Sequence, residues 1–109
     1  MMKEPSEVVI FVTVAAEEEA RGIAERLLNQ RKVACVNVVP KVDSLFWWQG
    51  NIETEQEKLL IIKTKASLLP EVVRIVKEVH SYDVPEIIAL PIIGGNEDYL
   101  KWIHSEVEG

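Results

Sequence analysis

The order of strand-like and helix-like segments along the chain leaves few folds open. Residues 7–14, "EVVIFVTV", form an unbroken apolar and β-branched run, which is typical of a central strand covered on at least one face. The segment after it carries one apolar stripe at helical spacing and three glutamates in its first turn, which predicts a helix that ends near Asn29. Further strands are predicted over 33–48, 51–65 and 85–93, and further helices over 67–79 and 97–107, with N-caps at Ser67 and Asn96.

Strand, helix, strand, strand, helix, strand and a C-terminal helix is the order of a ferredoxin-like α/β sandwich, an α+β fold. Another small α+β sheet is the alternative. The chain has 109 residues, 48% of them apolar, and no internal repeat, so we expect a single domain over residues 1–109.

The second and third predicted strands are too long for the helices that would cover them. A helix of about 14 residues spans ~20 Å, whereas residues 33–48 would extend over ~50 Å. Pro40 in this strand removes one ladder donor and indicates an edge position or a bulge. The far end of the hairpin carries "LFWW", Leu45 to Trp48, which a single chain would leave in water. We therefore expect this arm to be covered, most simply by another copy of the chain.

Charge and cysteine content limit the classes of partner. Eighteen acidic and twelve basic residues give a net charge of −6, which disfavours nucleic-acid binding. Cys35 is the single cysteine, so it forms no intramolecular disulfide, and the start of the chain lacks the charge pattern of a signal peptide. No apolar run reaches the roughly 20 residues of a membrane span. We expect a cytoplasmic protein with no membrane segment.

The stretch "HSYDVPEIIALPI" gathers polar side chains where a helix gives way to a strand. His80, Ser81 and Asp83 have the residue types of a hydrolase triad, but near neighbours at a helix end rarely converge as a triad must. His80 followed by Tyr82, Asp83 and Glu86 suits copper or zinc. A histidine at a helix C-terminus, facing unpaired carbonyls, is the structural alternative, and the residues alone favour it.

Three other polar residues are open to plain structural interpretations. Glu86 begins a predicted buried strand and needs a cation, for which Lys63 is a better candidate than Lys65. Cys35 lies among valines and is expected to be a small buried hydrophobe. His104 is expected on the surface of the last helix.

In this order, the segments "RKVACVNVVP", "SLFWWQG", "LLIIKT", "HSYDVPEIIALPI" and "YLKWI" closely resemble the CutA divalent-cation tolerance proteins over almost the whole chain. The resemblance implies a ferredoxin-like protomer, a tight homotrimer built through the long arm, an association with copper and other divalent cations, and no catalysis. The residues that fall on the motif positions of the family are Cys35, Trp48, Gly50, Lys63, Thr64, His80, Tyr82, Pro85 and Glu86.

The metal ligands that the resemblance implies are His80, Glu86 and Cys35. Copper-associated members similar to this chain carry a cysteine at the end of the first strand and a second histidine, where this chain has Val12 and Val79. We therefore expect weak binding of Cu²⁺ or another divalent cation, in a protein of metal-ion homeostasis.

A second function class stays open, because the PII signalling proteins are similar in fold and trimer and bind small anionic ligands between subunits. In that interpretation Lys63, Tyr82 and Trp48, together with Glu86, would line an intersubunit pocket. A small anionic ligand or an unidentified protein would then be the partner. An enzyme that uses Glu86 and Tyr82 in proton transfer is the third interpretation.

Overall fold

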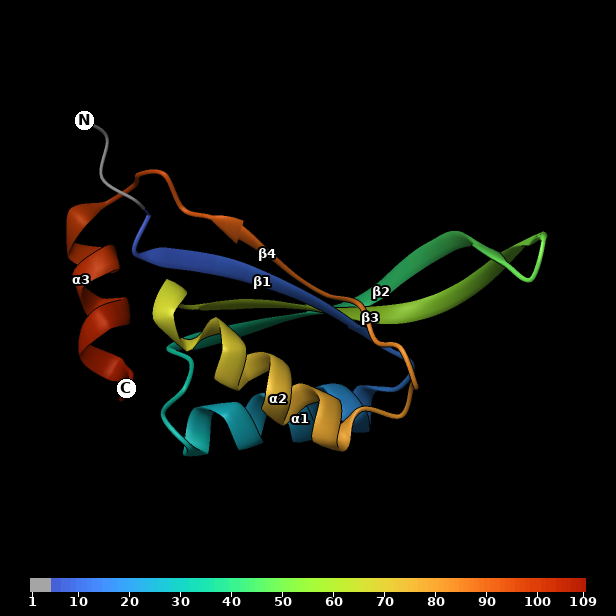
Figure 1. The fold of residues 1–109 in the computed structure, drawn as a ribbon, viewed down its shortest axis with the longest axis horizontal. Helices are drawn as coiled ribbons and strands as arrows, with labels where there is room; N and C mark the ends of the chain where they lie inside the picture. Colours follow the sequence, from blue (N-terminus) through green and yellow to red (C-terminus); the bar gives the residue numbers. More distant parts are fainter. Residues whose placement is uncertain (1–4) are drawn as a thin grey trace.

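The computed structural model describes residues 5–109 and contains one four-stranded antiparallel sheet with strand order β2-β3-β1-β4 (Figure 1). The elements, in chain order, are β1 (Glu7–Val14), α1 (Glu17–Asn29), β2 (Cys35–Trp48), β3 (Asn51–Lys65), the 3₁₀ turn η1 (Ala66–Leu68), α2 (Leu69–Val79), β4 (Ile87–Pro91) and α3 (Glu97–Glu106). This order and pairing confirm the predicted ferredoxin-like sandwich. Within residues 5–109, no helix is long and apolar enough to cross a membrane.

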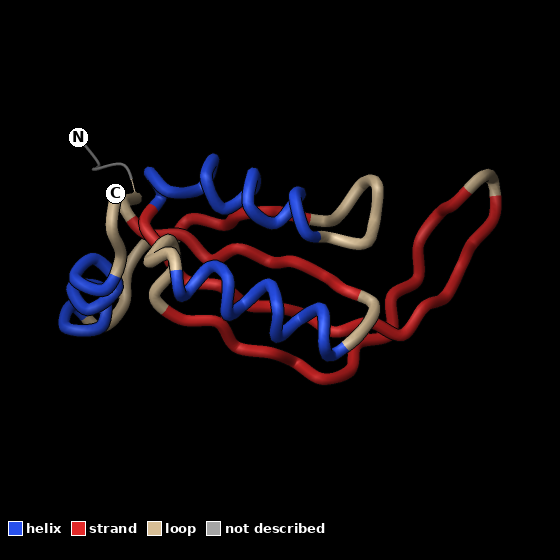
Figure 2. Tube along the Cα trace, turned by 90° about the horizontal axis from the view of Figure 1, so that it is seen from below, coloured by secondary structure: helices blue, strands red, loops and turns tan. Residues whose placement is uncertain are grey.

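α1 and α2 lie side by side on one face of the sheet, and the core lies between the two layers (Figure 2). Alternate residues of the two central strands point into this core and are fully buried, as the strand period requires. They are Ile10, Val12, Val14, Leu60 and Ile62. From the helices they meet Ala20, Ile23, Leu27, Val72, Ile75 and Val76.

Of the two predicted N-caps, the one at Asn96 is confirmed and the one at Ser67 is wrong. Asn96 caps α3 as predicted, because its side chain accepts a hydrogen bond from the Asp98 backbone N–H at 3.0 Å. Ser67 does not cap α2 and lies inside η1. α2 begins at Leu69 directly after this turn, and Pro70 in its first turn has no N–H that needs a cap. The cap prediction at Ser67 was therefore wrong.

The β2–β3 hairpin leaves the sheet as a twisted arm that extends well past the helices (Figure 1), which confirms the predicted overshoot. Gln49 and Gly50 both have positive φ, 49° and 82°, which suits a two-residue turn between right-twisted strands. β2 is an edge strand and its register shifts between Val39 and Val42. Pro40 thus lies at a bulge on an edge strand, as its missing N–H requires.

The second face of the sheet is not covered by α1 and α2. One row of residues runs across it from Cys35 through Lys63 and Val9 to Leu90, and the next runs from Asn37 through Ile61 and Phe11 to Ile88. We call these two rows the open face. α3 lies at one end of the sheet, opposite the arm (Figure 1). The long arm and the open face expose apolar side chains, and the junction over residues 80–86 gathers polar ones. These three regions are the candidates for a functional site.

Candidate functional site

His80 follows the last residue of α2, and its side chain is completely buried. Its backbone N–H donates to the Val76 carbonyl at 2.9 Å and closes the helix. Ring nitrogen Nε2 lies 2.8 Å from the Thr13 carbonyl oxygen, and Nδ1 lies 3.0 Å from the Tyr82 backbone N–H. A carbonyl only accepts and an N–H only donates, so Nε2 carries the proton and Nδ1 presents its lone pair. Both ring nitrogens therefore have hydrogen-bond partners within the chain.

Glu19, in the first turn of α1, binds the residue that follows His80. Its carboxylate accepts the Ser81 backbone N–H at 2.7 Å and the Ser81 hydroxyl at 3.0 Å. The same carboxylate lies 3.6 Å from Nδ1 of His80. This contact is not an ion pair, because Nδ1 already accepts a hydrogen bond from the Tyr82 backbone N–H. The Ser81 hydroxyl thus bonds to Glu19, whereas a triad would require it to bond to a ring nitrogen of His80, and both of those have other partners.

Tyr82 joins the junction to the base of the arm. Its ring packs on the His80 ring with centroids 4.8 Å apart, and its hydroxyl donates to Glu57 Oε2 at 2.8 Å. Glu57, on β3, is buried with 7% of its surface exposed. Burial and the bonded Glu57 carboxylate both raise the pKa of Tyr82 far above its usual value of 10. At neutral pH the phenol is therefore a permanent donor to a buried carboxylate.

The three predicted metal ligands do not meet in one chain. Cys35 pairs with Lys63 at the level of Val9, whereas His80 bonds to Thr13, four residues or ~14 Å further along β1 and on the helix side. Glu86 is exposed just before β4. Among residues 5–109 no three His, Cys, Asp or Glu side chains are placed to hold a metal ion. The residues of a single chain therefore do not fit a preformed metal site.

Lys63 does not hold Glu86, so the predicted ion pair was wrong for the single chain. The ammonium group instead contacts the Asn37 amide oxygen and lies 3.8 Å from the Cys35 sulfur. The strand order explains this, since β4 pairs with β1 and not with β3. Glu86 also precedes Ile87, the partner of Val12, and so lies toward the opposite end of the sheet from Lys63.

The predicted anion-pocket residues are also dispersed within one chain. Lys63 lies six residues, or ~20 Å, along β3 from Glu57, which Tyr82 contacts. Trp48 lies at the tip of the arm, 57% exposed and paired with Asn51. These side chains could share a pocket only if another copy of the chain brought them together.

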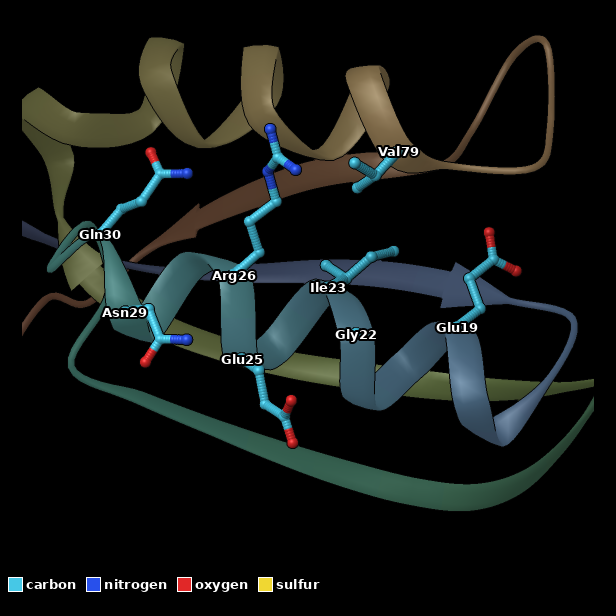
Figure 3. A pocket seen from close by; sticks show the side chains of 8 residues that line it. All are labelled: Glu19, Gly22, Ile23, Glu25, Arg26, Asn29, Gln30 and Val79. Atoms are coloured by element: carbon cyan, nitrogen blue, oxygen red, sulfur yellow. The ribbon is translucent and has the colours of Figure 1, made fainter.

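A groove of about 670 Å³ runs between α1 and α2 on the outer side of the helix layer (Figure 3). It is lined by Glu19, Gly22, Ile23, Glu25, Arg26, Asn29, Gln30 and Val79. Arg26 pairs with Glu78 at 3.4 Å, an exposed contact of small energetic weight. The predicted site residues do not line this groove, and its mixed lining carries no evident chemistry.

Sequence reasoning missed three residues that matter in the structure. Glu19 and Glu57 bind the junction, and His104, expected on the surface, contacts the buried carboxylate of Glu7. A local signal existed for Glu57, which is the last acid before β3 turns apolar. For Glu19 and His104 the partners lie 62 and 97 residues away, beyond any sequence window.

The comparisons with known proteins agree on one family. Residues 8–106 match the model of the CutA1 divalent ion tolerance protein family. A divalent-cation tolerance protein CutA from Thermus thermophilus is 47% identical over 97 residues, which cover 89% of this chain and 94% of that protein. A chloroplastic protein CutA 1 from rice, Oryza sativa, is 48% identical over 96 residues, which are 88% of this chain.

The rice protein is longer, and the match covers 54% of it, so the chain spans about half the length of that relative. The solved structure described as a divalent cation tolerance protein from Thermus thermophilus superposes with a TM-score of 0.91. That superposition covers 94% of this chain and 99% of the solved chain, at 45% identity.

Proposed function

Since the chain belongs to the CutA1 divalent ion tolerance protein family, we propose that it acts in divalent-cation tolerance as a cytoplasmic homotrimer, without a catalytic step of its own. The family match over residues 8–106 is the observation that carries the cation part. The apolar surface that one chain leaves uncovered supports assembly, and the number of three copies rests on the resemblance to the family.

The open face supports assembly because it is apolar and solvent-exposed along β4. Ile88 and Leu90 expose 51% and 49% of their surface, and their partners on β1, Phe11 and Val9, are only half-buried. The arm adds Leu45, Phe46, Trp47, Trp48 and Ile52, all exposed. So many large apolar side chains exposed in one chain indicate an interface. Copies of the same chain supply apolar faces of matching chemistry.

Assembly is tested by the mass of the protein in solution. Sedimentation or light scattering at micromolar concentration should give three times the 12.4 kDa of one chain. Replacing Trp47 and Trp48 with serine should weaken the assembly, since aromatic side chains commonly anchor interfaces. Lys41→Ser, an exposed change at the base of the arm, is the control. A wild-type monomer at that concentration would refute the trimer.

We propose that Cu²⁺ binding is weak and uses His80, with Glu86 and Cys35 as further candidate ligands. Cu²⁺ prefers imidazole nitrogen among such ligands, but His80 would first have to release Thr13 or Tyr82. Each hydrogen bond given up costs about 0.5–1.5 kcal/mol, which lowers the affinity. A ligand set drawn from more than one chain would also make the affinity depend on assembly.

Calorimetric titration of Cu²⁺ tests this proposal on the assembled protein. His80→Ala should reduce the affinity, whereas His104→Ala, which removes the other of the two histidines, should leave it unchanged. Glu86→Gln and Cys35→Ser report on the other two candidates. Equal affinities of wild type and His80→Ala would remove His80 from the cation site and leave it a purely structural residue.

One observation favours a small anionic ligand as the second candidate. Lys63 presents its ammonium group on the open face, where it is half-buried and contacts the neutral Asn37 amide and the Cys35 thiol. Tyr82 fits this function poorly, because its hydroxyl already donates to Glu57. A panel of nucleotides titrated into wild type and Lys63→Met would detect such a ligand. Binding that is lost in Lys63→Met would favour this candidate over the cation.

A further inference from the structure

The open face continues along one side of the arm. The register shift between Val39 and Val42 puts the extra residue into β2, so the side chains of β3 alternate without interruption from the sheet to the tip. The odd-numbered residues of β3 thus share one side, which in the sheet is the side of Ile61 and Lys63. On the arm they are Asn51, Glu53, Glu55 and Glu57. The open face therefore becomes acidic where the arm leaves the sheet.

β2 adds aromatic side chains to the same side of the arm. Phe46 pairs with Glu53, Trp48 pairs with Asn51, and both aromatic side chains are exposed. We call Phe46, Trp48, Glu53 and Glu55 the acidic arm face. Carboxylates beside exposed rings suit lysine and arginine, whose apolar stems pack on the rings while their charged groups meet the carboxylates. This face therefore fits a partner surface that presents a basic side chain.

The two glutamates of the acidic arm face lack a positive partner in their own chain. Within residues 5–109, neither Glu53 nor Glu55 takes part in an ion pair, and both are exposed. Glu57 differs from them, because it is buried and accepts the hydroxyl of Tyr82. Carboxylates at every second position of one strand repel one another. A cationic group from outside the chain would therefore stabilise this row.

Lys63 is the complementary group toward the other end of the same surface. Its ammonium group contacts the neutral amide of Asn37 and lies 3.8 Å from the Cys35 sulfur. None of the ion pairs among residues 5–109 includes this half-buried lysine. A partly buried charge is stabilised by an opposite charge. Glu55 cannot supply it within one chain, since it lies eight residues, or ~27 Å, away along β3.

We propose that the acidic arm face of each copy docks on the open face of the next copy at Lys63, so that Lys63 meets the carboxylates of Glu53 and Glu55 across the boundary. The apolar centre of the open face lies beside this contact and is covered with it. Three copies form a closed ring only through head-to-tail contacts, in which each arm lies on the following copy. This inference rests on the proposed homotrimer and specifies which two surfaces meet.

Disulfide cross-linking tests the contact directly, because Cys35 is the single cysteine and pairs with Lys63. Glu53→Cys and Glu55→Cys each add a thiol to the acidic arm face. Under oxidised glutathione, at least one of them should form a disulfide with Cys35 of the next copy, seen on a non-reducing denaturing gel. Thr54→Cys, exposed on the opposite side of the same strand, is the matched control and should stay unlinked.

The largest linked species reports the arrangement of the copies. At complete oxidation, head-to-tail contacts link three chains of 12.4 kDa each, whereas mutual contacts between two copies link only two. A covalent trimer would support the proposal. A ladder that ends at the dimer, or Thr54→Cys linked as fully as the Glu53→Cys and Glu55→Cys variants, would overturn it.

Charge reversal tests the same contact without new thiols. Lys63→Glu, and the arm variant that combines Glu53→Lys with Glu55→Lys, should each raise the concentration at which the assembly dissociates by roughly tenfold, because like charges then meet. Joining the two sets of changes in one chain should recover most of this loss. The control combines Thr54→Lys with Gln56→Lys on the opposite side of the arm and should assemble like wild type.

The outcomes separate this inference from the proposed trimer. A trimeric wild type whose dissociation is unaffected by either reversal, or not recovered when the two are joined, would overturn the inference and leave the trimer in place. A wild type that is monomeric at micromolar concentration would refute both.

Discussion

The two faces of one sheet are completed in different ways. On the helix side, Val12, Leu60 and Ile62 are fully buried against α1 and α2. On the open face, Ile88 and Leu90 of the same sheet remain about half exposed, although their chemistry is equally apolar. Strand alternation alone decides which residue faces which side. The comparison shows that the helix side is buried within the chain, whereas the open face leaves apolar side chains exposed, which is the basis of the proposed assembly.

A matched pair of truncations gives the largest effect and tests this difference directly. Leu60→Ala would leave a cavity in the closed core and should lower the free energy of unfolding by about 2–5 kcal/mol. Leu90→Ala removes the same atoms from the open face, and in a dissociated chain it should cost much less. Urea denaturation at several protein concentrations measures both.

The concentration dependence distinguishes the two sites. The loss in Leu60→Ala should persist at every protein concentration, while the loss in Leu90→Ala should grow with concentration, because it acts on assembled copies. Equal losses at all concentrations would mean that the open face contributes no interface.

The junction provides the next test, because there a polar group is satisfied inside the chain. Tyr82→Phe keeps the ring on His80 but removes the hydroxyl that donates to the buried Glu57 carboxylate. Leaving such an acceptor unsatisfied should cost about 1–3 kcal/mol, or more since it is charged. Thermal unfolding measures the loss, and the double variant Tyr82→Phe with Glu57→Leu should recover part of it. If Tyr82→Phe melts like wild type, water satisfies Glu57.

The sequence predicted those parts of the fold that depend on local pattern. The strand run at residues 7–14, the arm over 51–65 and the Asn96 cap follow from spacing and turn chemistry, and all three are confirmed. Ser67 was placed as a cap by the same kind of reasoning, but the 3₁₀ turn before Pro70 made a cap unnecessary. Local rules therefore failed where two short elements join without a gap.

Side-chain partners were much harder to predict than elements. His80 was correctly interpreted as a helix-end residue, but its acceptor, Thr13, lies 67 residues away. The Lys63–Glu86 pairing failed because charge and strand position do not reveal which strands are neighbours. The same limit applies to the proposed assembly through the open face, because its contacts would lie between chains. Contacts that depend on strand order or on a second molecule leave no periodic trace in the sequence.

The contact between His104 of α3 and Glu7 of β1 predicts a smaller effect, which is a dependence of thermal stability on pH. Burial raises the pKa of Glu7, but the hydrogen bonds from Ser6 and His104 and the charge of His104 outweigh it, so the pKa lies below 4.5. A carboxyl whose folded pKa is lowered stabilises the fold above its unfolded pKa, and this contribution is lost as the pH falls through the folded value. Between pH 5 and pH 3, wild type should therefore lose more thermal stability than Glu7→Gln. Parallel losses in the two proteins would mean that Glu7 is not held as a carboxylate.

The smallest expected effect is at Glu86, and it separates the single chain from the assembly. Within one chain Glu86 is exposed and Lys63 bonds elsewhere, so Glu86→Gln should change the free energy of unfolding of dissociated chains by at most about 0.5 kcal/mol. If Glu86 pairs with a cationic group of another subunit, Glu86→Gln should lower the free energy of unfolding of the assembled protein by more than this. Denaturation of Glu86→Gln below and above the assembly concentration, with Asp83→Asn as an exposed control, makes the comparison. A loss well above that limit in dissociated chains would show that Glu86 has a partner within its own chain, and a loss confined to the assembled protein would show that the partner belongs to another copy.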